Sequence, residues 1–209
     1  MKIAVVASNG KASRAIIEEL VGRGHKVTGF ARSENKSAAQ NFVQKDILDL
    51  TKEDLAGFDA VVDGFGAYTP ETLPLHTKTS QHLVDLVAGT ETRLYIVGGA
   101  GSLYVDPAHR VQLVDTPAFP AEFYPLAKAQ TEELAALRSR TDTKWVFVSP
   151  AADFRADGEK TGKYILGGEE LTLSAAGESV ISYQDYALGM VDLIESGGHI
   201  GTRVSLVQA

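Results

Sequence analysis

The first turn of the chain has residue types suited to holding a charged ligand. An apolar run, Ile3-Ala4-Val5-Val6, leads into Ala7-Ser8-Asn9-Gly10-Lys11-Ala12-Ser13. Dinucleotide-binding loops place three glycines at this point, and here the three positions hold Ala7, Gly10 and Ser13. Only Gly10, which would face phosphate, is kept, although alanine and serine are the smallest replacements. If a helix follows Gly10, its free amides can meet a pyrophosphate. The alternative is a small-residue turn in a generic α/β domain.

The end of the next apolar run bears on which nucleotide would fit. NAD-specific domains carry an acidic residue there, for the ribose 2′-hydroxyl, whereas an arginine suits a 2′-phosphate. This chain has Ala31-Arg32-Ser33, with no acid before Glu34. Arg32 can bind a phosphate with two hydrogen bonds, and Lys11 can add charge. We therefore expect NADP(H) to be preferred, with NAD(H) possible; the alternative is an ordinary solvated arginine.

Tyr124 and Lys128 have the spacing of a Tyr-x-x-x-Lys pair, which one helical turn brings to one face. A nearby cation lowers the pKa of a phenol, so that tyrosine can pass a proton to a carbonyl as hydride arrives. Ser102 would be the matching hydroxyl that orients the substrate. Pro125 opposes this assignment, because a residue before proline avoids the α region; we expect Tyr124 to precede the first helical turn. The alternative is an ordinary tyrosine beside an exposed lysine.

The elements that would position these residues alternate between short apolar runs and amphipathic helical stretches. This pattern predicts an α/β fold with a doubly wound parallel sheet, as a single domain over residues 1–209. Residues 151–209, rich in glycine, are expected to form a small C-terminal lobe within it. Capping boxes are predicted at Thr51 with Asp54 and at Ser182 with Asp185. The predicted strands are 3–7, 26–31, about 43–45, 59–65, 93–97, 145–148, 164–166, 171–173 and 203–207; the predicted helices are 11–21, a brief one after Thr51, 74–88, 125–138 and 183–195.

Composition excludes several classes of function. The 209 residues include no cysteine, so disulfides and thiolate chemistry are excluded, and the five histidines have no metal-ligand spacing. A net charge of −7 argues against a nucleic-acid partner. No secretory leader or membrane span is expected, and we expect a cytoplasmic location. The partner is expected to be a small-molecule acceptor; the oligomeric state is not predicted.

Several segments together resemble the atypical short-chain dehydrogenase/reductase group. They are the opening Met-Lys-Ile-Ala-Val-Val, the turn through Gly10, the run from His25 to Arg32, Arg93-Leu-Tyr-Ile-Val-Gly-Gly-Ala-Gly-Ser-Leu103, the Trp145 strand ending at Pro150, and Gly177-Glu-Ser-Val-Ile-Ser-Tyr-Gln-Asp-Tyr-Ala187. Over nearly its whole length the chain is most similar to small bacterial NAD(P)H-binding proteins described as NADH-flavin reductases, which are related to biliverdin reductase B and to NmrA-like proteins. The resemblance implies a Rossmann-type fold.

The resemblance also implies a set of cofactor contacts. The pyrophosphate would be held by Ala7, Asn9, Gly10, Lys11 and Ala12. Arg32 would hold the 2′-phosphate, and Asp46 and Ile47 would flank the adenine. The ribose would pass Phe65 and Gly66, and the nicotinamide end would lie against Gly98, Gly99, Pro150 and Ala151.

Three functions follow as hypotheses. The first is an NAD(P)H-dependent reductase that transfers hydride to a flavin or quinone-like acceptor, with flavin as substrate only. Phe65, Tyr68, Phe119 and Phe154 are candidates to stack on such a ring. The second is a non-catalytic NADP(H) sensor of the NmrA type. The third is a carbonyl reductase that uses Ser102, Tyr124 and Lys128.

Overall fold

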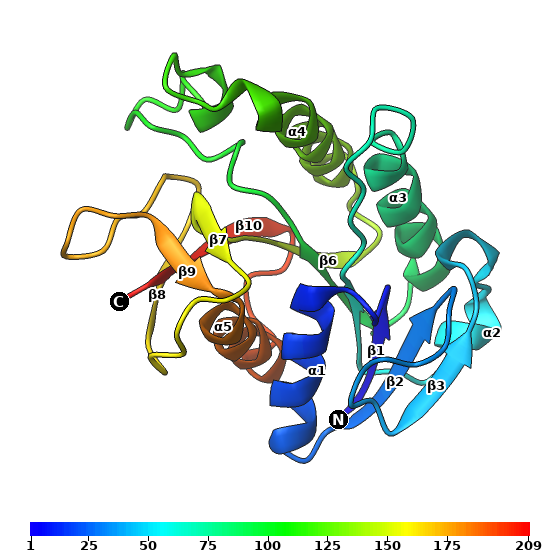
Figure 1. Cartoon of the computed structure of the whole chain (residues 1–209). Helices are drawn as coiled ribbons and strands as arrows, with labels where there is room; N and C mark the ends of the chain where they lie inside the picture. Colours follow the sequence, from blue (N-terminus) through cyan, green and yellow to red (C-terminus); the bar gives the residue numbers. More distant parts are fainter.

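Eight strands form the central sheet, in the order β3-β2-β1-β4-β5-β6-β10-β8 (Figure 1). The computed structural model describes all 209 residues. All neighbouring strands run parallel except β8, which is antiparallel to β10. The chain moves outward from β1 to β3, then returns and builds the other half from β4, so the direction reverses between β1 and β4. The strands are β1 Lys2–Val6, β2 Lys26–Ala31, β3 Asn41–Gln44, β4 Ala60–Asp63, β5 Arg93–Val97, β6 Lys144–Ser149, β8 Tyr164–Gly167 and β10 Thr202–Gln208.

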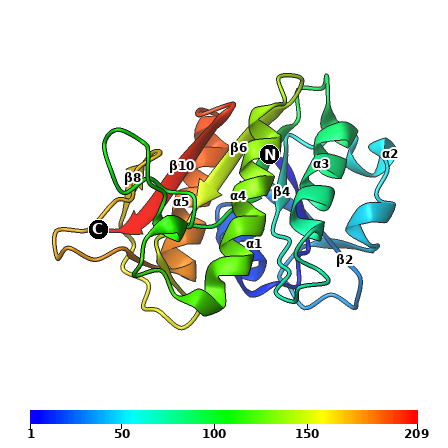
Figure 2. The ribbon, with the colours of Figure 1, turned by 90° about the horizontal axis from the view of Figure 1, so that it is seen from above.

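Helices cover both faces of this sheet, as the predicted doubly wound fold requires (Figure 2). The helices α1 (Lys11–Gly22) and α5 (Tyr183–Ser196) pack side by side on one face. On the other face lie α3 (Leu75–Val87) and α4 (Tyr124–Arg138), with the short α2 (Lys52–Leu55) beside α3. Three 3-10 turns complete the helical elements: η1 Ile47–Asp49, η2 Leu113–Asp115 and η3 Ala121–Phe123.

The buried strands read as continuous apolar runs because each face of the sheet has its own core. In β1, Ile3 and Val5 pack into the core beneath α1 and α5, while Ala4 and Val6 pack into the core beneath α3 and α4. Each such buried valine or isoleucine contributes about 1.5–3 kcal/mol. A central strand therefore has no solvent-facing side on which polar residues could alternate.

Most predicted elements are confirmed, and two local predictions are wrong. Residues 171–173 form no strand; an isolated bridge joins Tyr104 to Glu170 just before them. Tyr124 is helical, with φ −56° and ψ −46°, because η3 leads into α4 without a break.

The two predicted capping boxes also differ. The box at Thr51 and Asp54 is present in both directions. At α5 only half of it forms: the Ser182 hydroxyl accepts from the Asp185 amide at 3.1 Å. The buried Asp185 carboxylate instead accepts hydrogen bonds from the Thr161 and Gly162 amides at 2.9 and 2.8 Å, and so anchors that loop.

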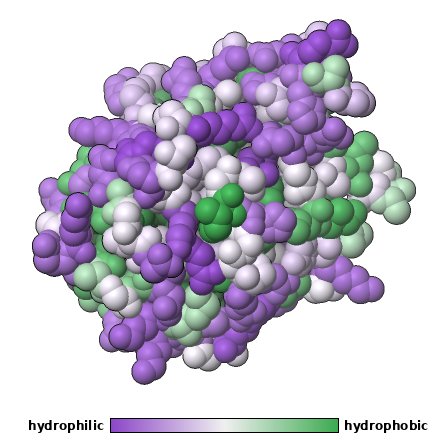
Figure 3. All heavy atoms as spheres, turned by 180° about the vertical axis from the view of Figure 1, so that it is seen from behind, coloured by the Kyte–Doolittle hydropathy of each residue, from purple (hydrophilic) through white to green (hydrophobic).

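The last sixty residues contribute to two sheets. Their longest strand, β10, lies inside the main sheet, whereas β7 (Asp153–Arg155) and β9 (Val180–Ser182) form a separate parallel pair (Figure 1). The face of the molecule that points away from the viewer in Figure 1 is mainly hydrophilic, with apolar residues in small scattered groups (Figure 3). No helix has both the length and the apolar character needed to cross a membrane.

Candidate functional site

The loops that carry the predicted contacts meet at one edge of the sheet. In the parallel register Val6 pairs with Asp63, Asp63 with Ile96, and Val97 with Val148. The chain therefore leaves β1, β4, β5 and β6 at nearly the same level, at the carboxyl ends where open α/β sheets bind ligands. This edge brings together the segments beginning at Ala7, Gly64, Gly98 and Pro150.

The turn after β1 keeps the shape of a glycine-rich loop despite its substitutions. Ala7 has φ +55°, the left-handed region that glycine occupies without cost. A Cβ on Gly10 would lie 3.3 Å from the Ala7 carbonyl oxygen and 3.4 Å from Ser13 Oγ, so this position is tight. Ser13 is fully buried, and its side chain takes the space that any side chain on Gly64 would need. A glycine directly after β4 thus provides the close helix–strand approach that a third loop glycine normally allows.

The N-terminus of α1 offers free donors at this turn. Gly10 caps the helix in an extended conformation and without a side-chain hydrogen bond, so the first amides of the helix keep no protein partner. Lys11 is exposed at the first helical position. One turn along, Arg14 has a buried Nε with no hydrogen-bond partner, a feature that sequence analysis missed. Free amides, two cations and a tight glycine fit the charge and close approach of a pyrophosphate.

Asn9 acts between two loops. Its Nδ2 donates to the Glu34 carbonyl oxygen at 2.8 Å and to Ser33 Oγ at 3.1 Å, and the Lys36 amide donates to its Oδ1 at 2.8 Å. The side chain of Asn9 therefore fixes the loop after β2 against the loop after β1, and the contact of this residue with pyrophosphate stays a prediction. That loop begins at Arg32, so Asn9 sets the distance between the two predicted phosphate sites.

Arg32 lies at the surface with most of its side chain free. It is 81% exposed, and its nearest ion-pair partner is Asp46, with Nε 3.8 Å from Oδ2. Asp46 also caps η1, since its Oδ1 accepts from the Leu48 amide at 2.9 Å, and the adjacent Ile47 is buried. Such an exposed and loosely paired guanidinium can turn toward a phosphate at little cost.

The segments after β4, β5 and β6 form the floor of the site. Gly66 is exposed and Phe65 is half-buried, while Gly98, Pro150 and Ala151 are buried. A side chain at Gly98 would overlap the buried Phe147 ring, so this glycine is sterically required, whereas a side chain at Gly99 would require the flexible Gln130 amide to move. Beneath Phe65 lies Asp63, whose Oδ1 accepts the Phe65 amide at 3.0 Å. Burial raises the pKa of Asp63 to about 6.

The three residues of the predicted triad each have another partner. Ser102 is buried, and its hydroxyl accepts from Arg203 Nη1 at 3.3 Å. Lys128 Nζ lies 2.9 Å from Asp115 Oδ1 and 5.5 Å from the centroid of the Tyr124 ring. Tyr124 lines an open hollow of about 500 Å³ with Phe119, whereas Lys128 lines a separate hollow of about 200 Å³ beside Pro74. No hydrogen bond joins Ser102 to Tyr124, and their catalytic role stays a prediction.

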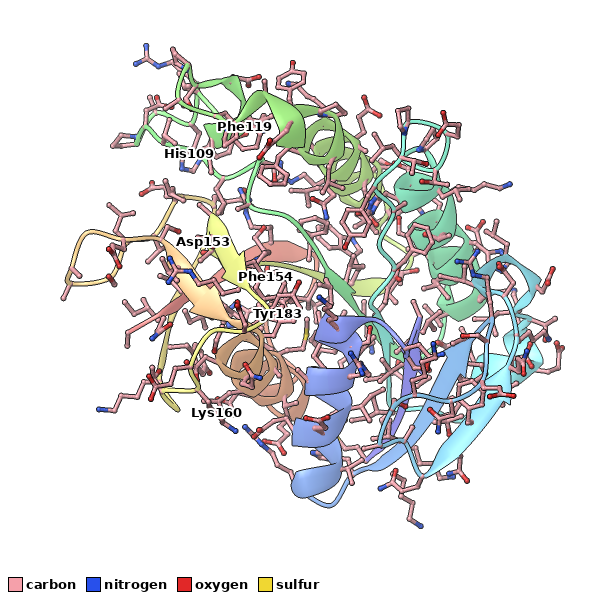
Figure 4. All side chains as sticks on the ribbon, in the orientation of Figure 1. His109, Phe119, Asp153, Phe154, Lys160 and Tyr183 are labelled. Atoms are coloured by element: carbon pink, nitrogen blue, oxygen red, sulfur yellow. The ribbon has the colours of Figure 1, made fainter.

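An aromatic wall borders the site opposite the loop after β4. The rings of Phe154 and Tyr183 pack with centroids 4.1 Å apart and their planes tilted by 44°, and the Phe154 ring centroid also lies 4.8 Å from that of Tyr186. The buried Tyr186 hydroxyl donates to the Val148 carbonyl oxygen at 2.7 Å, which fixes the wall to the end of β6. Figure 4 shows Phe154 and Tyr183 between the β7–β9 pair and the N-terminal end of α1.

Tyr183 is a site residue that sequence analysis missed. Its hydroxyl makes no hydrogen bond within the protein, and its pKa is raised by burial and by the nearby Tyr68 phenol, so the group stays a neutral donor. Tyr68, 77% exposed, lies on the loop after β4. The sequence signal that could have found Tyr183 is its place directly after the predicted N-cap Ser182, at a helix start.

Comparison with known proteins agrees with this geometry. Residues 8–196 match the model of a family described as NAD(P)H-binding. The chain belongs to that family. The predicted resemblance to NAD(P)H-binding Rossmann proteins is thereby confirmed.

Three relatives extend over essentially the whole chain. The crystal structure of SP1627 from Streptococcus pneumoniae TIGR4, which has been proposed to be an NADH-flavin reductase, is 57% identical with a TM-score of 0.98, and both chains are covered completely. A crystal structure of a protein from Lactobacillus casei is 30% identical, has a TM-score of 0.90 and also covers both chains completely. The uncharacterised protein YwnB of Bacillus subtilis (strain 168) is 41% identical over 99% of this chain and 98% of its own length.

Proposed function

We propose that this family member is an oxidoreductase that prefers NADP(H) and reduces a planar acceptor, such as a flavin or a quinone. The observation that carries the proposal is the Phe154–Tyr183 wall beside the N-terminal end of α1. It gives an apolar aromatic surface and one unused phenol donor at the end of the site where the nicotinamide would lie. The flavin-reductase assignment of the relative SP1627 supports the same choice.

Different residues would bind the nucleotide and position the acceptor. The amides of α1 and the cations Lys11 and Arg14 would hold the pyrophosphate, and Arg32 the 2′-phosphate. When bound, the reduced nicotinamide supplies a hydride, which carries two electrons to the acceptor. The aromatic wall orients the acceptor ring, and the Tyr183 hydroxyl donates a hydrogen bond to an acceptor oxygen or nitrogen. The proton that completes the reduction comes from water. Because flavins and quinones accept hydride readily, no Ser-Tyr-Lys triad is needed.

Nucleotide preference is tested by titrating the protein with NADPH and NADH while following nucleotide fluorescence. A charge-assisted phosphate contact contributes about 1.5–3 kcal/mol, so Arg32→Ala should weaken NADPH binding by about 10- to 100-fold. NADH binding should be unchanged, because NADH has no 2′-phosphate. Arg110→Ala, which removes a similarly exposed arginine at another part of the surface, is the control. Equal losses for both nucleotides would contradict the role given to Arg32.

A further inference from the structure

Three buried ionisable side chains lie beneath the segment after β4. Asp63 ends β4, His76 lies on α3 and Glu133 lies on α4, and each is at most 2% exposed. No lysine or arginine forms an ion pair with either carboxyl; the nearest charged or titratable partner of Glu133 is His76, with Nδ1 3.8 Å from Oε2. Asp63 Oδ2 and Glu133 Oε2 are buried without any hydrogen bond. Such groups cost stability, so their presence needs a function.

His76 connects this cluster to the backbone of Ala67, in the segment after β4 that forms part of the floor of the site. A single ring nitrogen, Nε2, lies 3.1 Å from the Ala67 carbonyl oxygen and 3.3 Å from the Ala67 amide nitrogen. In a neutral imidazole that nitrogen is either a donor or an acceptor. It therefore binds the carbonyl in one tautomer and the amide in the other. The edge of Phe65 packs on the same ring, with centroids 5.4 Å apart.

We propose that the protonation state of Glu133 selects the tautomer of His76, and thereby which backbone group of Ala67 the imidazole binds. With Glu133 protonated, its O–H donates to Nδ1, and Nε2–H donates to the Ala67 carbonyl. When Glu133 gives its proton to water, Nδ1–H donates to the carboxylate, and Nε2 accepts the Ala67 amide. The imidazole proton passes from Nε2 to Nδ1. A closure of about 1 Å between Nδ1 and Oε2 completes the hydrogen bond in either state.

The surroundings determine which state prevails. Burial, and then the charge of Asp63, raise the pKa of Glu133 well above its ordinary value, and the Ser80 hydroxyl on α3 acts in the opposite direction. Burial lowers the pKa of His76. Both shifts favour the neutral forms of Glu133 and His76, which together give the carbonyl-binding tautomer. The change to the amide-binding tautomer follows when rising pH ionises Glu133.

This change would reach the nucleotide through a short path. Gly64 packs so closely against Ser13 of α1 that no side chain would fit between them, so we expect movement at Ala67 to fall on Phe65 and Gly66. Those are the residues expected beside the ribose, and this consequence rests on the proposed nucleotide site. His76 and Glu133 are then positioning residues, which adjust nucleotide affinity without touching the nucleotide.

The tautomer is measured by nitrogen NMR of the histidine rings in the unmodified protein, from about pH 6 to about pH 10. We expect His76 to change from the Nε2–H to the Nδ1–H form. In Glu133→Gln, the amide can donate to Nδ1 at every pH, so the Nε2–H form should persist. Glu132→Gln, one residue away and exposed, should behave as the unmodified protein does.

Nucleotide affinity gives the second readout. Because one backbone hydrogen bond of Ala67 replaces another and the exchange displaces Phe65 and Gly66, the NADPH dissociation constant should change by up to about fivefold across the same range. Glu133→Gln should abolish that pH dependence, and Glu132→Gln should keep it. The inference is overturned if His76 keeps one tautomer at every pH, or if Glu133→Gln follows the profile of the unmodified protein. Absence of any nucleotide binding would instead contradict the proposed function, while the NMR result would still decide the tautomer.

Discussion

The two ends of the site are built from different kinds of contact. At the nucleotide end, the loops after β1 and β2 are cross-linked by Asn9, and the groups proposed to hold the phosphates come from the first fifty residues. At the proposed acceptor end, Phe154 lies on β7 and Tyr183 on α5, and Ser102 is held by Arg203, about a hundred residues further along. The proposed phosphate contacts are thus close in sequence, whereas the proposed acceptor contacts depend on tertiary packing. Substitutions at the two ends should affect nucleotide binding and turnover separately.

Asp63→Asn tests the cost of the charge beneath the nucleotide end, and has the largest expected effect on stability. The folded-state pKa of about 6 lies above the ordinary value of 3.8, so ionisation costs stability. The penalty grows as pH rises from about 4 to about 6 and is complete above that range. Two pKa units correspond to about 3 kcal/mol, so the variant should be more stable by up to that amount at pH 8.

Urea unfolding at acidic and alkaline pH measures this gain. Asparagine keeps the oxygen that accepts the Phe65 amide, so the backbone hydrogen bond survives. Asp59→Asn, at an exposed position directly before the same strand, is the matched control. Equal stability changes for Asp63→Asn at low and high pH would show that Asp63 carries no ionisation penalty.

Tyr183→Phe and Tyr124→Phe compare the two candidate phenols at the acceptor end. Tyr183→Phe keeps the packing on Phe154 but removes the donor, and one lost hydrogen bond predicts about a fivefold fall in kcat/KM for the acceptor. NADPH affinity should not change. Tyr124→Phe should change kcat/KM by less than about twofold, because its hydroxyl is outside the aromatic wall. A large loss in Tyr124→Phe alone would restore the triad hypothesis.

Ala7→Gly has the smallest expected effect. Alanine at φ +55° is strained by about 1 kcal/mol, part of which is offset because glycine gains freedom in the unfolded chain. We expect a net stabilisation of about 0.5 kcal/mol and nucleotide affinity equal to or higher than that of the unmodified protein. Ala15→Gly, inside α1, should destabilise instead, by about 0.5–1 kcal/mol. A lower thermal unfolding temperature for Ala7→Gly than for the unmodified protein would show that the backbone of Ala7 is not strained.

Much of the fold could be predicted because its signals are local. The runs that became β2 and β5 have their predicted bounds, since a strand buried on both faces is apolar throughout. The Thr51–Asp54 box was predictable because both halves lie within four residues. Tyr124 was wrongly placed because the proline rule describes a preference of one dipeptide, and the turn η3 overrides it.

The features of the site that could not be predicted depend on residues far apart in the sequence. Asn9 was expected to contact phosphate, but its hydrogen bonds go to residues 33–36, which only the folded sheet brings near. The Asp63–His76–Glu133 cluster joins three elements, and its only sequence signals are a carboxylate in an apolar strand and another on the apolar face of a helix. Neither signal identifies its partner.

Hydride transfer from bound NADPH to a planar acceptor can be observed directly by mixing the NADPH-bound protein with FMN or riboflavin in a stopped-flow instrument and following the nicotinamide absorbance. We expect loss of that absorbance at a rate that saturates with flavin concentration, together with loss of flavin absorbance. NADPH that binds tightly but is not oxidised by flavin or quinone would contradict the reductase assignment and favour a nucleotide sensor.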